Sequence, residues 1–279
     1  MHGIWNRQKG LSAQDAAAGL ALDAGGHLAR GLAKAEASLP APPEVVMAYY
    51  ADLLFDDPVD ERQDEGDDGL DDLTDAELVL AQRWLELAGV EVPDEPQNPF
   101  LWPVRQALGV LARRRGGSVQ RCGRVVAALI REVSAYTGQR HRREAARDRI
   151  AEAIRRARPG VVVAHSLGSV VAYEALHAHP DLEVDLLVTL GSPLGAPGAV
   201  FHALDPAPRG ERGAKPAGVA RWENYADLGD LVALPPRLGD RFPVDHHADV
   251  HIGLLDFHTL GAYLGHPEVA GALTRHVDR

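Results

Sequence analysis

The sequence predicts an α/β fold, with a mostly parallel sheet and helices on both of its faces, in one domain covering residues 1–279. A continuous apolar run, 161–165, and a mainly apolar run, 184–190, are separated by a helical pattern over 167–179. Apolar runs that alternate with helices are typical of parallel strands whose faces are both covered. Apolar residues make up 46% of the chain, which is enough for a large core.

The remaining elements follow from hydrophobic periodicity and from turn residues. One short apolar run in the N-terminal half predicts a buried strand over 45–50. Helical patterns in that half cover 12–37, 75–89, 104–115, 118–136 and 141–157. In the C-terminal half we expect strands over 219–226 and 249–253, and helices over 259–265 and 267–276.

The net charge of -11 comes almost entirely from one segment, 56–75, which holds eleven acidic residues and one Arg. Such a segment has almost nothing to bury, and it predicts an acidic loop. Segment 105–158 has the opposite bias, with fifteen Arg and four acids. The two segments either face each other or are each solvated. Basic residues so mixed with apolar ones are more typical of outer helix faces than of a nucleic-acid site, so we expect no nucleic-acid partner.

Several protein classes are disfavoured by the sequence. No apolar run approaches the roughly 20 residues that a membrane span needs, and the N-terminus lacks a signal-peptide pattern, so a soluble cytoplasmic protein is expected. The single cysteine, Cys122, cannot form an internal disulfide or a multi-thiolate zinc site. His246 and His247 lie near Asp245 and Asp249, but adjacent histidines do not readily converge on one ion. We therefore expect no metal and no other cofactor.

Ser166 lies where the strand 161–165 meets a helix, within Ala-His-Ser-Leu-Gly. A nucleophilic serine at such a junction sits on a tight, strained turn, which requires small residues two positions before and after it. Those positions hold Ala164 and Gly168. Glycine is usual at both, and alanine at the first still meets the steric requirement. The alternative is that Ser166 only caps the helix.

The run VVVAHSLGSVVAYEAL, residues 161–176, resembles the α/β-hydrolase superfamily in its bacterial lipase-like and esterase-like branch. The resemblance implies a serine hydrolase that cleaves an ester through an acyl-enzyme. It also implies a helical cap insertion, here at roughly 76–140 behind the acidic loop. The family has a strand before the dipeptide His2-Gly3, so we expect either truncated N-terminal strands or a natural start upstream of Met1.

The resemblance further implies the chain order serine, acid, histidine for a catalytic triad. Asp230 lies in a loop after the expected strand 219–226, where the family carries its acid, and Asp227 is the alternative. His258 lies in a loop that leads into a helix, where the family carries its base, and His251 is the alternative. The expected triad is therefore Ser166, Asp230 and His258.

Acyl transfer needs backbone N–H donors aimed at a tetrahedral oxyanion. By the same resemblance, one donor is the amide of Leu167, directly after the nucleophile. The second follows His2-Gly3 and is the amide of Ile4, with Trp5 as the alternative.

The sequence leaves the substrate open. A small-molecule or lipid acyl ester is the first expectation, and a thioester or amide the second. One set of apolar residues predicts either an acyl pocket or ordinary helix packing: Leu101, Trp102, Val104, Leu108, Val110 and Leu111. Two other functions stay open. One is an acyltransferase with the same triad, and the other is a non-catalytic protein that binds a protein partner through the charged insertion 56–158.

Overall fold

The computed structural model describes residues 1–4, 6–8, 10–37, 41, 43–55, 69–91, 101–115, 118–253 and 258–277. Its strands are β1 (Val161–His165), β2 (Val184–Leu190), β3 (Val219–Ala226) and β4 (His246–Asp249). Its α-helices are α1 (Ala13–Lys34), α2 (Asp75–Leu87), α3 (Leu101–Arg115), α4 (Val119–Gly138), α5 (Arg140–Ala157), α6 (Leu167–Ala178), α7 (Leu260–Leu264) and α8 (Pro267–Val277).

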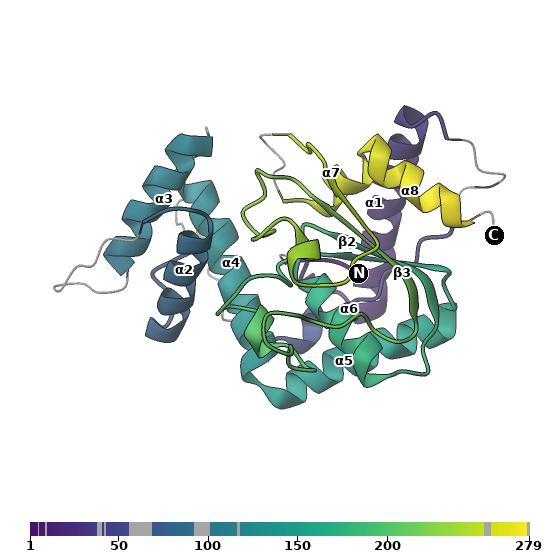
Figure 1. The fold of residues 1–279 in the computed structure, drawn as a ribbon, viewed down its shortest axis with the longest axis horizontal. Coiled ribbons are helices and arrows are strands. Elements are labelled where there is room, and N and C mark those ends of the chain that lie inside the picture. Colours follow the sequence, from purple (N-terminus) through teal and green to yellow (C-terminus); the bar gives the residue numbers. More distant parts are fainter. Residues whose placement is uncertain are drawn as a thin grey trace.

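The α/β prediction is confirmed. The four strands form one sheet in the order β1-β2-β3-β4, and every neighbouring pair is parallel. Helices α1, α7 and α8 cover one face of the sheet, and α5 and α6 cover the other (Figure 1). Side chains alternate between the two layers, as strand geometry requires. Val162 and Ala164 pack with α5 and α6, whereas Val161 and Val163 pack on the side of α1 and α8.

Two strand predictions were wrong. The described residues 43–50 have no regular secondary structure, although residues 47–50 are buried. Their side chains suit a strand, but a strand also needs a neighbour to pair with, and the sequence does not show whether one is present. The last strand is β4 at 246–249 rather than 249–253, because residues 246–249 pair with Glu223–Ala226. His246 and His247 therefore lie in a strand.

Helices α2, α3 and α4 form a lobe beside the sheet (Figure 1). Val104, Leu108 and Leu111 are buried in the packing of these helices, so they serve as core residues here, while Trp102 is 41% exposed. Residues 56–68 of the acidic segment 56–75 lie outside the described residues. Its described remainder faces the basic helices, because two ion pairs join them: Arg105–Asp71 at 2.6 Å and Arg131–Asp72 at 3.2 Å.

Helices α4 and α5 are held to α6 around a buried carboxylate. Glu174 of α6 has no exposed side-chain surface. It accepts hydrogen bonds from Tyr136 Oη at 2.6 Å and from Arg143 Nε at 2.7 Å, and a second Arg143 nitrogen also donates to it. The backbone N–H of Asp205 donates to the same carboxylate at 3.1 Å. A buried charge of this kind is stable only while its partners remain.

None of the helices in the described part of the chain is both long enough and apolar enough to cross a membrane.

The hydrogen bonds around Glu174 give a prediction about the stability of the protein. Arg143→Met leaves a buried carboxylate without its charged partner, and we expect the free energy of unfolding to fall by about 3 kcal/mol in urea denaturation. The matched control is Arg140→Met, which removes the exposed pair with Glu144 in the same helix and should change stability little. Equal effects of the two substitutions would contradict the role assigned to Glu174.

Candidate active site

The candidate site lies where β1, β2 and β3 end. Parallel strands deliver their carboxyl ends to the same edge of a sheet, so residues that follow different strands meet there. Ser166 follows β1, Gly191 follows β2, and the loop 227–234 follows β3. His258 comes from the far end of the chain, just before α7.

Ser166 adopts a strained backbone conformation between β1 and α6, with φ 54° and ψ -134°. A positive φ is uncommon for a residue other than glycine, and it costs on the order of 1–3 kcal/mol. Packing at the turn is tight, because a Cβ on Gly168 would lie 2.3 Å from the carbonyl oxygen of His2. The serine side chain does not cap α6 by a hydrogen bond, so the alternative role as a helix cap has no support.

Two hydrogen bonds connect the serine, the imidazole and a carboxylate. Ser166 Oγ lies 2.7 Å from His258 Nε2, and His258 Nδ1 lies 2.8 Å from Asp230 Oδ2. A carboxylate only accepts, so Nδ1 carries the proton and Nε2 is free to accept from the serine hydroxyl. The structure thus brings together the three residues expected from the sequence. This arrangement can remove a proton from the hydroxyl and hold the positive charge that then forms on the ring.

Asp230 is held in place by further contacts. Tyr263 Oη donates to Asp230 Oδ2 at 2.7 Å, and the N–H of Val232 donates to Oδ1 at 2.8 Å. Gly191 has φ 53°, and a Cβ there would lie 2.6 Å from Asp230 Oδ2. Tyr263 could not be found from the sequence, because no motif links a tyrosine in α7 to an acid 33 residues earlier. The lobe reaches this loop too, since Trp84 Nε1 of α2 donates to the carbonyl of Leu231 at 2.6 Å.

The alternative acid and base lie outside this chain of hydrogen bonds. Asp227 accepts from the N–H groups of Gly229 at 2.5 Å and of Ile252 at 2.8 Å, which is a turn-stabilising role. His251 lies 3.4 Å from Asp227, and its side chain is 78% exposed. Neither residue is hydrogen-bonded to Ser166 or to His258 in the described structure.

His165 packs against the imidazole of His258, with 4.6 Å between ring centroids and 29° between planes. Both ring nitrogens of His165 are buried and have no hydrogen-bond partner among the described residues. Burial lowers the pKa of His165 well below its usual value, so the ring is neutral. A neutral ring beside His258 adds no fixed positive charge next to the imidazolium that proton transfer would create.

Residues 2–4 lie directly against the serine turn. A Cβ on Gly3 would lie 2.5 Å from Ser166 Cβ and 2.5 Å from His165 Nδ1, so only glycine fits there. Ile4 is buried next to it, and Trp5 lies outside the described residues. Leu167 is the first residue of α6, where backbone N–H groups lack helical partners. The two expected N–H donors thus come from segments that flank Ser166.

Solvent does not reach the site in this structure. Ser166 is 0% exposed, and the side chains of His258 and Asp230 are 1% and 0% exposed. The serine therefore does not project into an open cleft. Any molecule that binds here must displace some of the residues that bury Ser166 before it can contact the hydroxyl.

No group of three or more His, Cys, Asp or Glu side chains in the described ranges is arranged to hold a metal ion. His247 is hydrogen-bonded to Asn224 at 2.9 Å and to Asp249 at 3.0 Å, while His246 packs beside the ring of Tyr225. The two adjacent histidines thus have separate partners.

No protein-family model matches the chain, and no curated protein and no solved structure shows significant similarity to it.

His2 gives a pH prediction for this region. Its Nε2 accepts from the N–H of Tyr50 at 3.2 Å, and burial lowers its pKa from 6.5 to about 3. Below pH 6.5 the unfolded chain therefore binds a proton at His2 that the folded chain does not bind. The free energy of unfolding then falls with acidification between pH 6.5 and 3, by up to about 1.4 kcal/mol per pH unit.

Urea denaturation at several pH values measures this slope. We expect a shallower pH dependence for His2→Phe and an unchanged one for His251→Phe, which alters an exposed ring. An identical slope for wild type and His2→Phe would contradict the assignment.

Proposed function

We propose that the protein is a serine hydrolase of the α/β-hydrolase type, which cleaves a carboxylic ester through an acyl-enzyme. Ser166 is the nucleophile, His258 the general base and Asp230 the residue that orients the base. The observation that carries the proposal is the hydrogen-bonded chain Ser166–His258–Asp230, starting from a strained serine at a strand-to-helix turn. A buried hydroxyl that serves only structure has no need of this strain or of this base.

In the first half of the reaction, Ser166 Oγ attacks the ester carbonyl carbon while its proton passes to His258 Nε2. The carbonyl electron pair moves onto oxygen, and the tetrahedral oxyanion takes hydrogen bonds from the backbone N–H groups of Leu167 and Ile4. When the C–O bond to the alcohol breaks, His258 returns the proton to the leaving oxygen. The acyl group is then an ester of Ser166.

In the second half, water replaces the alcohol. His258 Nε2 accepts a proton from water as the water oxygen bonds to the acyl carbon. The oxyanion then collapses, the bond between the acyl carbon and Ser166 Oγ breaks, and His258 returns the proton to Oγ, which releases the carboxylic acid and restores the serine. Asp230 keeps its negative charge throughout and stabilises the imidazolium. Transfer to an alcohol instead of water would make the same residues an acyltransferase, and the outcome depends on which acceptor enters the opened site.

One observation favours a second function. The complete burial of Ser166 is consistent with a non-catalytic protein that uses the charged lobe to bind a partner. The three side chains would then be a buried polar cluster that stabilises the fold.

Labelling with a fluorophosphonate separates the two functions, because the probe forms a bond to an activated serine and releases fluoride. We expect the wild type to be labelled and Ser166→Ala to be unlabelled, with kcat on a short-chain aryl ester reduced by at least about 10³-fold. Ser12→Ala, which changes an exposed residue at the start of α1, should be labelled like the wild type. Folded wild-type protein that resists labelling and cleaves no ester would favour the binding function.

A second prediction separates the two candidate acids. Asp230→Asn removes the carboxylate that keeps the proton on His258 Nδ1, so we expect kcat to fall by about 10³- to 10⁴-fold while the fold is retained. Asp227→Asn disturbs the turn at Gly229 and Ile252 and should lower stability with a much smaller effect on kcat. The proposal fails if Asp227→Asn causes the larger loss of kcat.

Tyr263 should act as a positioning residue. Tyr263→Phe removes the hydrogen bond to Asp230, and the one that Tyr263 Oη accepts from the N–H of Asp227, but keeps the ring. We expect kcat to fall roughly five- to tenfold with little change in KM. Tyr225→Phe is the matched control, because it removes another buried hydrogen bond from a tyrosine to a carboxylate, that of Glu223. Comparable losses of kcat in both variants would mean that Tyr263 has no special role.

A further inference from the structure

Two buried serines lie behind the turn that carries Ser166. Ser169 is in the first turn of α6, and Ser192 is in the loop after β2. They are 0% and 2% exposed, and their Oγ atoms lie 2.6 Å apart. The proposed mechanism uses neither hydroxyl. Because a buried hydroxyl without a partner is costly, the hydrogen bonds that these two groups make can be traced from donor to acceptor.

The two hydroxyls form a directed chain of hydrogen bonds. Ser169 Oγ donates to the carbonyl oxygen of Ser166 at 2.6 Å. A serine hydroxyl has one hydrogen, so the Ser169 oxygen can only accept in its contact with Ser192. Ser192 Oγ is therefore the donor in that contact, and it accepts in turn from the N–H of Leu194 at 3.3 Å. The chain starts at Leu194 and ends on the carbonyl of Ser166.

The carbonyl of Ser166 belongs to the same peptide group as the N–H of Leu167. That N–H is one of the two donors that the proposed function assigns to the oxyanion, and it has no acceptor within α6. The carbonyl oxygen accepts from Ser169 Oγ and also from the N–H of Ser169 at 2.9 Å. The peptide group is planar, so bonds that hold its oxygen also fix the direction of its N–H.

Hydrogen bonds to a carbonyl oxygen also make the N–H of the same peptide group a stronger donor. They draw electron density toward the oxygen and increase the double-bond character of the C–N bond, which leaves the N–H more polarised. Along a chain, each hydrogen bond strengthens the next by roughly 10–30%. The bond from Ser169 should therefore have the main effect on Leu167, and Ser192 should reinforce it.

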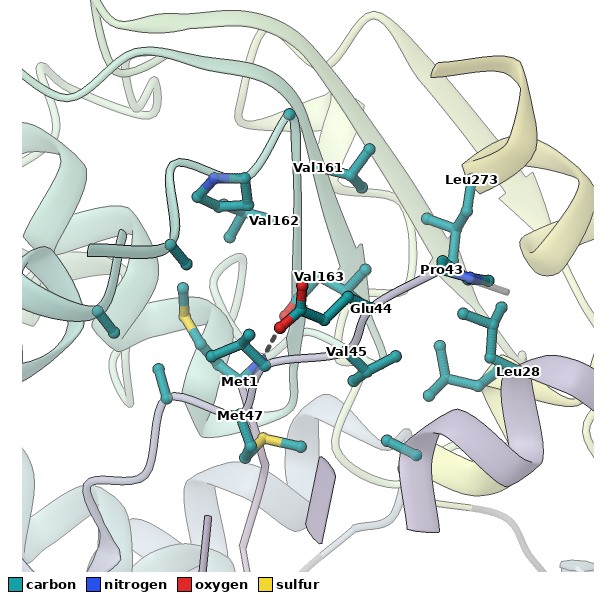
Figure 2. A pocket seen from close by; sticks show the side chains of 18 of the residues that line it. Met1, Leu28, Pro43, Glu44, Val45, Met47, Val161, Val162, Val163 and Leu273 are labelled. Carbon is teal, nitrogen blue, oxygen red and sulfur yellow. Dashed lines mark hydrogen bonds between the residues drawn. The ribbon is translucent and has the colours of Figure 1, made fainter. Parts of the chain in front are cut away.

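Support for the serine turn from the side of β2 matters, because a cavity borders β1 on its other side. This cavity of about 720 Å³ has residues 159–163 as one wall and residues 43–48 as the opposite wall (Figure 2). The turn is joined to β2 by two connections. The N–H of Ser166 donates to the carbonyl of Leu190 at 3.0 Å, and the hydroxyl chain reaches the turn from Ser192.

We propose that Ser169 and Ser192 are positioning residues for the oxyanion hole, because their hydrogen-bond chain orients and polarises the peptide group that contains the N–H of Leu167. This role rests on the proposed function and adds to it the control of one oxyanion donor. The negative charge on the substrate oxygen is largest in the tetrahedral state, so a stronger donor stabilises that state more than the bound ester. Loss of the chain should thus lower kcat and leave KM nearly unchanged.

The test compares Ser169→Ala with Ser192→Ala on a short-chain aryl ester. Ser169→Ala removes the bond to the carbonyl of Ser166, and we expect kcat to fall about tenfold. Ser192→Ala keeps that bond and removes its reinforcement, so kcat should fall about two- to threefold. Binding of an alkyl trifluoromethyl ketone, which adds to an activated serine and forms an oxyanion, should weaken by the same factors.

Thr189→Val is the matched control, because it removes another buried hydroxyl close to the same edge of the sheet. Thr189 Oγ1 donates to Asn224 Oδ1 at 2.8 Å and accepts from Trp222 Nε1 at 3.1 Å. We expect this variant to lose stability in urea denaturation and to keep the kcat of the wild type. The pH dependence of kcat/KM should be the same in all variants, because the hydroxyl chain does not touch His258.

Amide NMR tests the role of the two serines without using activity. Loss of the Ser169 hydroxyl should move the proton signal of the Leu167 N–H upfield, because the donor is less polarised. The assigned role is refuted by an unchanged Leu167 signal, or by a folded Ser169→Ala whose kcat falls no more than that of Thr189→Val. A wild type that resists labelling and cleaves no ester would instead refute the proposed function, and the Leu167 signal would still decide whether the serines control this peptide group.

Discussion

The hydrogen-bonded chain from Ser166 through His258 to Asp230 depends on one constraint, which is that three parallel strands end at the same edge of the sheet. The serine and the acid are 64 residues apart, and the imidazole comes from a segment after the last strand. The sheet brings the serine and the acid to one edge, and the segment before α7 places the imidazole between them. The strain at Ser166 is tolerated because β1, α6 and residues 2–4 fix the turn from three directions.

The side chains around the hydrogen-bonded residues Ser166, His258 and Asp230 are mainly neutral and shielded from solvent. His2 and His165 are buried, and burial lowers the pKa of both rings, so neither carries a charge near the serine at neutral pH. In such surroundings the carboxylate of Asp230 is the partner for any positive charge that forms on His258. The same burial closes the site to solvent, so the proposed chemistry requires a motion that exposes Ser166.

Much of the fold could be predicted from the sequence, because β1 and β2 are mainly apolar runs bounded by turn residues, and β3 mixes aromatic and polar residues between such turns. Strand β4 begins three residues and ends four residues before its predicted limits, because its sequence, His-His-Ala-Asp, is not apolar and its limits are set by pairing with β3. Residues 45–50 resemble a strand but have no neighbour in the sheet. Whether a strand pairs with them depends on distant parts of the chain, which local sequence does not encode.

The site was predictable where a local motif exists. Ser166 follows from small residues around a strand-to-helix turn, whereas the choice of Asp230 and His258 relied on a resemblance. Tyr263 and the ring of His165 could not be assigned roles, because their contacts with Asp230 and His258 arise only in the folded chain. Complete burial of the serine was not foreseen either, since it depends on how distant segments pack over the turn.

The most direct measurement is nitrogen NMR of the protein with labelled histidine, with the signal of His258 assigned by its loss in His258→Gln. A ring fixed between Ser166 and Asp230 should show, at neutral pH, a protonated Nδ1 that exchanges slowly with solvent and an unprotonated Nε2. A ring that averages rapidly between tautomers, or that carries its proton on Nε2, would contradict the hydrogen-bonded chain on which the proposed function rests.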